Sequence, residues 1–98
     1  MTINKEIQDK TMTLKLAGRL DTTTSPELEE ELKASLDGIE DLRMDFSELE
    51  YISSAGLRIL LAAQKTMNKQ GEMKLIHVND VINEIFEVTG FSDILNIE

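Results

Sequence analysis

The sequence contains no cysteine, only one proline, and only four aromatic residues, three phenylalanines and one tyrosine. Without cysteine there is neither a disulfide framework nor a thiolate metal site. No apolar run reaches the roughly 20 residues that a membrane-spanning helix needs. The N-terminus lacks the basic-then-apolar pattern of a signal peptide, so we expect the mature chain to begin at or near Met1. These absences favour a cytoplasmic protein of bacterial type, with a core packed mainly by Leu, Ile, Val and Met.

The 98 residues are enough for a single domain over 1–98, because a second hydrophobic core would leave too little chain for either. Ten basic residues stand against nineteen acidic ones, a formal net charge of −9. This charge repels phosphate backbones and argues against direct binding of nucleic acid. It favours a partner with a basic surface, although acidic surfaces also keep small proteins soluble.

The pattern of apolar and turn residues predicts alternating strands and helices. The expected elements are strands at 3–8 and 11–17, a helix entered at Thr24–Pro26 and ended by Gly38, a strand at 42–46, a helix at 54–70, a strand at 73–78, a helix at 80–89 and a short turn at 92–95. The first two strands form an antiparallel hairpin, whereas strands separated by helices run parallel. We therefore expect an α/β fold with a mixed four-stranded sheet and helices packed mainly on one face.

Residues at the predicted helix ends support these boundaries. Thr24 or Ser25 can cap the first helix, and Pro26 suits its first turn, where a backbone N–H would have no partner. Asn79 is the expected cap of the last helix, and Gly90 is its expected end.

No set of catalytic or metal-binding residues is recognisable. His77 is the only histidine, and its place in a predicted strand is more typical of a structural residue than of a catalyst or ligand. The acidic runs at 29–31 and 45–50 are more typical of a solvated surface than of a cation site. Neither Gly-rich phosphate-loop motif occurs. The sequence indicates a binding protein rather than an enzyme, with no cofactor and no metal.

The most distinctive segment is 45–58, which joins a strand to the longest predicted helix. Small residues at 53–56 let the backbone turn sharply and leave the hydroxyls of Ser53 and Ser54 at a helix start, where unpaired N–H groups collect. One serine can cap the helix. A serine here can also accept phosphate, because a helix N-terminus tolerates added negative charge. The two roles are compatible if Ser53 caps and Ser54 projects.

Over nearly its whole length the chain resembles the anti-sigma-factor antagonist family of STAS domains. The matching motifs are Gly18-Arg19-Leu20-Asp21, Asp45-Phe46-Ser47, Tyr51-Ile52-Ser53-Ser54-Ala55-Gly56-Leu57 and Thr89-Gly90-Phe91. The resemblance implies a STAS fold and a partner switch. In this family, the unphosphorylated antagonist binds an anti-sigma factor that is also a serine kinase. This binding frees the sigma factor. The kinase then phosphorylates and expels the antagonist, and a PP2C-type phosphatase restores binding. ATP and Mg²⁺ belong to the kinase.

The family's phosphoacceptor aligns with Ser54. The aspartate that usually precedes it is Ser53 here, which makes Ser53 the second choice as acceptor. The resemblance implies partner contacts at Asp21, Thr22, Thr23, Ser53, Ser54, Ala55, Gly56, Leu57 and Arg58. Two alternatives stay open. One is a phosphorylation-independent STAS scaffold in a signalling complex, and the other is a small nucleotide-binding domain that uses the helix start at 54–56.

Overall fold

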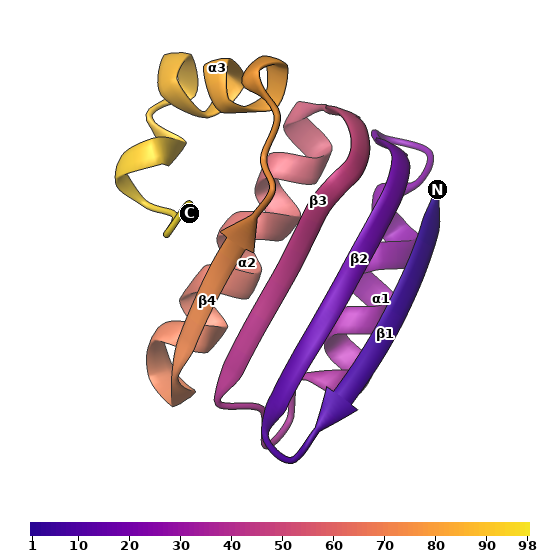
Figure 1. Cartoon of the computed structure of the whole chain (residues 1–98), viewed down its shortest axis with the longest axis vertical. Helices are drawn as coiled ribbons and strands as arrows, with labels where there is room; N and C mark the ends of the chain where they lie inside the picture. Colours follow the sequence, from indigo (N-terminus) through magenta and orange to yellow (C-terminus); the bar gives the residue numbers. More distant parts are fainter.

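The computed structural model describes residues 1–98 and contains one four-stranded sheet in the order β1-β2-β3-β4 (Figure 1). The strands are β1 (Thr2–Gln8), β2 (Thr11–Leu20), β3 (Asp41–Ile52) and β4 (Glu72–Ile76). β1 and β2 pair antiparallel, whereas β3 runs parallel to both β2 and β4. The predicted mixed sheet, with its N-terminal hairpin, is confirmed.

The helices are α1 (Ser25–Ser35), α2 (Ser54–Gln70) and α3 (Asp80–Thr89), followed by the short 3-10 turn η1 (Phe91–Asp93). α1 and α2 lie behind the sheet, and α3 lies beyond the carboxyl end of β4 (Figure 1). The opposite face of the sheet carries no helix. The helices therefore pack mainly on one face, as predicted. None of them is long and apolar enough to cross a lipid bilayer.

The core lies between the sheet and the helices and follows from the period-2 alternation of the strands. In β2, Met12, Leu14 and Leu16 are fully buried, while the residues between them are only half-buried. Phe46 of β3 and Phe86 of α3 are the largest fully buried side chains. Their ring centroids are 6.5 Å apart in a tilted arrangement, which joins α3 to the sheet.

Two strands extend further than the alternation predicts. β2 continues to Leu20 rather than to residue 17, and β3 continues to Ile52 rather than to residue 46. The register between them shifts twice, between Lys15 and Ala17 and between Gly18 and Arg19. Such bulges let paired strands continue past a break in the simple alternation, which explains why the predicted strands were too short.

Two other predicted boundaries were wrong. β4 ends at Ile76, because His77 has a φ of 58° and leaves the extended conformation. His77 is thus an exposed loop residue and not a strand residue. α1 ends at Ser35, before Gly38, which lies in the following loop with a φ of 82°.

The C-terminal end of α2, at Gln70 and Gly71, is held by hydrogen bonds and close packing. The Gly71 N–H donates to the Met67 carbonyl at 2.7 Å, and a Cβ at Gly71 would overlap the carbonyl oxygen of Glu40. The Gln70 side-chain amide donates to the carbonyls of Leu36 and Ile39, at 2.7 Å and 2.6 Å. These contacts join the C-terminal end of α2 to the loop after α1 and so fix the position of the helix.

Candidate functional site

The predicted contact residues meet at one end of the sheet. The β2–α1 loop (residues 21–24) follows the carboxyl end of β2, and the β3–α2 corner (residues 53–54) follows the carboxyl end of β3 (Figure 1). Parallel neighbours place their carboxyl ends at the same sheet edge. The Ser53 N–H donates to the carbonyl of Leu20 at 2.9 Å, so the corner is bonded directly to the last residue of β2.

The two serines of the corner have different surroundings. Ser54 is the first residue of α2, is exposed, and makes no side-chain hydrogen bond within the chain. Ser53 occupies the cap position with extended backbone, and its carbonyl accepts the first helical bond from the Leu57 N–H at 3.0 Å. Its hydroxyl oxygen, however, is buried without a hydrogen-bond partner. The predicted side-chain cap by Ser53 is therefore wrong, and the first N–H groups of α2 have no side-chain acceptor.

Close packing of helix on strands requires glycine at position 56. A Cβ there would lie 2.7 Å from Cγ of Leu20 and 2.8 Å from Cγ1 of Ile52. These two residues end β2 and β3, are paired in register, and are almost fully buried. The first turn of α2 therefore sits directly on the strand ends.

The predicted contact residues consequently fall into two groups. Gly56 and Leu57 are buried and hold the corner in place, so neither presents a side chain to a partner. Of the other predicted contact residues, Thr22, Thr23, Ser54 and Arg58 are exposed. Asp21, Ser53 and Ala55 are half-buried, and the hydroxyl oxygen of Ser53 is itself buried.

Asp21 organises the β2–α1 loop through hydrogen bonds to backbone amides. Its Oδ1 accepts from the N–H of Thr24 at 3.1 Å and from that of Thr23 at 3.0 Å. These bonds, that of Thr24 foremost, stabilise the charged form and lower the pKa of the Asp21 carboxyl, with a smaller contribution from the charge of Arg19. Asp21 is therefore an ionised, fixed group at the edge of the site.

Thr24 closes the same loop and does not cap α1 with its side chain. Its hydroxyl accepts from the Asp21 N–H at 2.9 Å and donates to the carbonyl of Arg19 at 2.7 Å. It occupies the cap position of α1 but makes no side-chain bond to the helix. The predicted side-chain cap by Thr24 or Ser25 is thus wrong, whereas Pro26 does lie in the first turn as expected.

Arg19 and Tyr51 form a contact beside this loop that the sequence analysis missed. The guanidinium carbon of Arg19 lies 4.4 Å from the centre of the Tyr51 ring, a cation–π arrangement. The Arg19 Nε is 3.8 Å from Oδ2 of Asp21. Both residues belong to the motifs quoted above, Arg19 to 18–21 and Tyr51 to 51–57, but nothing in the sequence indicates that they meet. Their pairing depends on the two bulges of the β2–β3 register.

A groove of about 300 Å³ leads away from the corner between α1 and α2. It is lined by Ser25, Pro26 and Glu29 of α1 and by Ala55, Arg58, Ile59 and Ala62 of α2. No group of three or more His, Asp and Glu side chains is placed to hold a metal ion. The arrangement is a partly apolar protein surface beside the corner that carries the exposed Ser54.

The chain is similar to known proteins over nearly its whole length. Residues 3–96 match the model of the family described as "Mlab, STAS domain". The chain is 33% identical, over 99 residues, to an anti-sigma-B factor antagonist of Staphylococcus aureus, covering 99% of this chain and 92% of the relative.

Two solved structures share the fold. An anti-sigma factor antagonist from Mycobacterium paratuberculosis superposes with a TM-score of 0.88 at 25% identity, over 98% of this chain and 83% of that one. The Bacillus cell fate determinant SpoIIAA in its phosphorylated form superposes with a TM-score of 0.77 at 15% identity, over 99% of this chain and 91% of that one. The chain belongs to the STAS-domain family of anti-sigma-factor antagonists.

Proposed function

We propose that this chain binds an anti-sigma factor with serine kinase activity, and that phosphorylation of Ser54 ends the binding. The observation that carries the proposal is the exposed hydroxyl of Ser54 on the first residue of α2, beside the ordered Asp21 loop. The Staphylococcus relative is described as antagonising an anti-sigma-B factor, and one structural neighbour was solved phosphorylated. A PP2C-type phosphatase would reset the switch.

Accessibility favours Ser54 over Ser53 as the acceptor. A kinase must bring the γ-phosphate of its own ATP in line with the attacking hydroxyl oxygen. The Ser54 hydroxyl is exposed, whereas the Ser53 hydroxyl oxygen is buried beneath the corner. Phosphorylation of Ser53 would require the start of α2 to move off the strand ends, and the packing at Gly56 opposes that movement.

The local electrostatics make phosphoserine tolerable within the chain but disruptive at an interface. A phosphate adds close to two negative charges at neutral pH. The first amides of α2 carry no side-chain acceptor, and Arg58 follows Ser54 by four positions, hence on the same side of the helix. No other Lys or Arg lies among residues 53–64. A partner surface that fits the uncharged serine would exclude water from this contact. Placing the phosphate charge there would weaken binding by on the order of 2–5 kcal/mol.

Intact-mass measurement tests the chemistry. Incubation with ATP, Mg²⁺ and the anti-sigma factor of the same organism is expected to add one phosphate to the wild type and to Ser53→Ala, but none to Ser54→Ala. A phosphate that persists in Ser54→Ala and disappears in Ser53→Ala would move the acceptor to Ser53. No added phosphate on the wild type would leave the phosphorylation-independent scaffold as the better description.

Calorimetric titration with the same anti-sigma factor tests the switch. Ser54→Ala is expected to bind like the wild type, because it removes only an unbonded hydroxyl. Ser54→Asp is expected to bind at least about tenfold more weakly, since it places a charge in the contact. Equal affinities of Ser54→Ala and Ser54→Asp would refute a charge-controlled switch at this residue.

A further inference from the structure

The C-terminal part of the chain combines strong negative charge with exposed aliphatic side chains. Residues 80–98 include five acidic residues and no Lys or Arg, so this fifth of the chain carries more than half of the net charge of −9. Four large apolar side chains of the protein are markedly exposed, and three of them lie in this segment: Val81 at 59%, Val88 at 78% and Ile94 at 47%. Exposed apolar groups concentrated in one segment indicate an interaction surface.

Helix geometry gathers two of these side chains on one stripe of α3. Val81 and Val88 are seven residues apart, about two helical turns, and therefore share a face. Half-buried Ile85 lies between them, while Ile82 and Phe86 are fully buried against the core. The apolar arc of α3 is thus wider than the surface that the rest of the chain covers. The stripe formed by Val81, Ile85 and Val88 is the edge of this arc that stays uncovered.

We propose that this stripe is a second docking surface for the anti-sigma factor, which would meet it with an apolar patch bordered by Lys or Arg side chains. The inference rests on the proposed function. Charge selects this occupant, because nucleic acid and anionic membrane surfaces are repelled by an acidic segment without any basic residue. A second copy of the chain would bring another five acidic residues against the first five.

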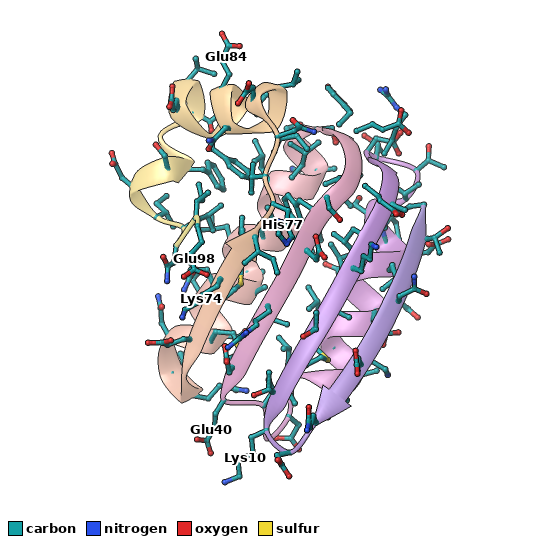
Figure 2. All side chains as sticks on the ribbon, in the orientation of Figure 1. Lys10, Glu40, Lys74, His77, Glu84 and Glu98 are labelled. Carbon is teal, nitrogen blue, oxygen red and sulfur yellow. The ribbon has the colours of Figure 1, made fainter.

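The position of α3 makes contact with the same partner possible. α3, the β2–α1 loop and the start of α2 all lie at the same end of the sheet (Figure 1). The Asn79 side chain, which caps α3 by accepting from the Ile82 N–H at 2.9 Å, also donates to the carbonyl of Leu49 in β3 at 2.9 Å. This bond fixes α3 relative to the strand that leads to Ser54. Glu84 projects from α3 away from the sheet, as a charged neighbour of the stripe (Figure 2).

The surface gives the partner a contact that phosphorylation of Ser54 does not alter. Affinity would then come from both surfaces together, and control from Ser54 alone. The double substitution Val81→Ser/Val88→Ser is expected to weaken binding of the anti-sigma factor about tenfold or more, because exposed aliphatic anchors are removed from a desolvated contact. Glu84→Lys is expected to weaken binding at low salt and to do so less at high salt.

Titration calorimetry with the purified anti-sigma factor of the same organism measures these effects. Matched controls are Ile7→Ser, a comparably exposed aliphatic at 49% on the edge strand β1, and Glu30→Lys, an exposed acidic residue on α1. Both controls are expected to stay within about twofold of the wild type. Thermal unfolding checks each variant, and Val88→Ser alone serves as the second test because that side chain has little packing to lose.

The outcomes separate this inference from the proposed function. Only the α3 surface would be overturned if the wild type binds, Ser54→Asp binds more weakly, and Val81→Ser/Val88→Ser binds as tightly as the wild type. Wild type that does not bind the anti-sigma factor would refute the proposed function and this inference with it. Sedimentation showing a wild-type dimer that Val81→Ser/Val88→Ser converts to monomer would assign the stripe to self-association and overturn the proposal.

Discussion

Replacement of Gly56 by alanine directly perturbs the contact that positions Ser54. The new methyl would meet Cγ of Leu20 at 2.7 Å and Cγ1 of Ile52 at 2.8 Å, both in the fully packed end of the sheet. Overpacking of this kind costs about 1–3 kcal/mol. Alanine recovers up to about 1 kcal/mol in a helix interior, and less in the first turn. We therefore expect Gly56→Ala to lower the free energy of unfolding by about 1–2 kcal/mol.

Thermal and urea unfolding followed by circular dichroism measure this change. In a domain of this size the loss corresponds to a fall in Tm of roughly 5–15 °C. In a Leu20→Ala background the same substitution is expected to cost at least about 1 kcal/mol less, because the nearest clashing atom is gone. Gly56→Ala as stable as the wild type in both backgrounds would refute the view that glycine is needed for close packing at this corner.

Two further substitutions test neighbouring features. Gly71→Ala is expected to lower the free energy of unfolding by about 2–4 kcal/mol in urea, more than Gly56→Ala does. The reason is that the overlapping atom is the backbone carbonyl of Glu40, which cannot rotate away as a side chain can. A smaller loss than that of Gly56→Ala would contradict this expectation. Asp21→Asn is expected to destabilise at neutral pH. The bonds from Thr24 and, to a smaller extent, Thr23 lower the pKa of Asp21. The wild type's extra stability is therefore present above the ordinary pKa of 3.8 and is lost as the pH falls through the lowered value. Urea unfolding at neutral pH and at about pH 3 checks this, and a gap of equal size at both would contradict it.

Local sequence patterns predicted the helices that have strong end signals. α2 spans residues 54–70 and α3 spans residues 80–89, both as predicted, because small residues, Asn79 and the glycines at 71 and 90 act within one turn of the helix end. The strand ends were predicted less well. The end of β3 depends on pairing with β2 through two register shifts, and such shifts are set by partner strands distant in sequence.

The accessibility of the candidate site was only partly predictable. The motif placed Ser53 and Ser54 together at a helix start, and the structure confirms that position. It could not show that the Ser53 hydroxyl is buried without a partner, since that depends on how the corner packs against β2. Nor did the sequence reveal the stripe of Val81 and Val88. The apolar side of α3 is broad, and only the folded structure shows which part of it packs against the rest of the chain and which part stays exposed.

The sequence alone determined the class of fold, the family and the pair of adjacent candidate serines, because alternation, end signals and a contiguous motif are properties of neighbouring residues. Tertiary structure decided which of two adjacent serines is accessible, which motif residues support the corner rather than face a partner, and which apolar side chains stay uncovered. Those properties depend on contacts between residues far apart in the chain. Leu20 and Gly56 are one example, because their distance in space is set by the packing of α2 on the sheet.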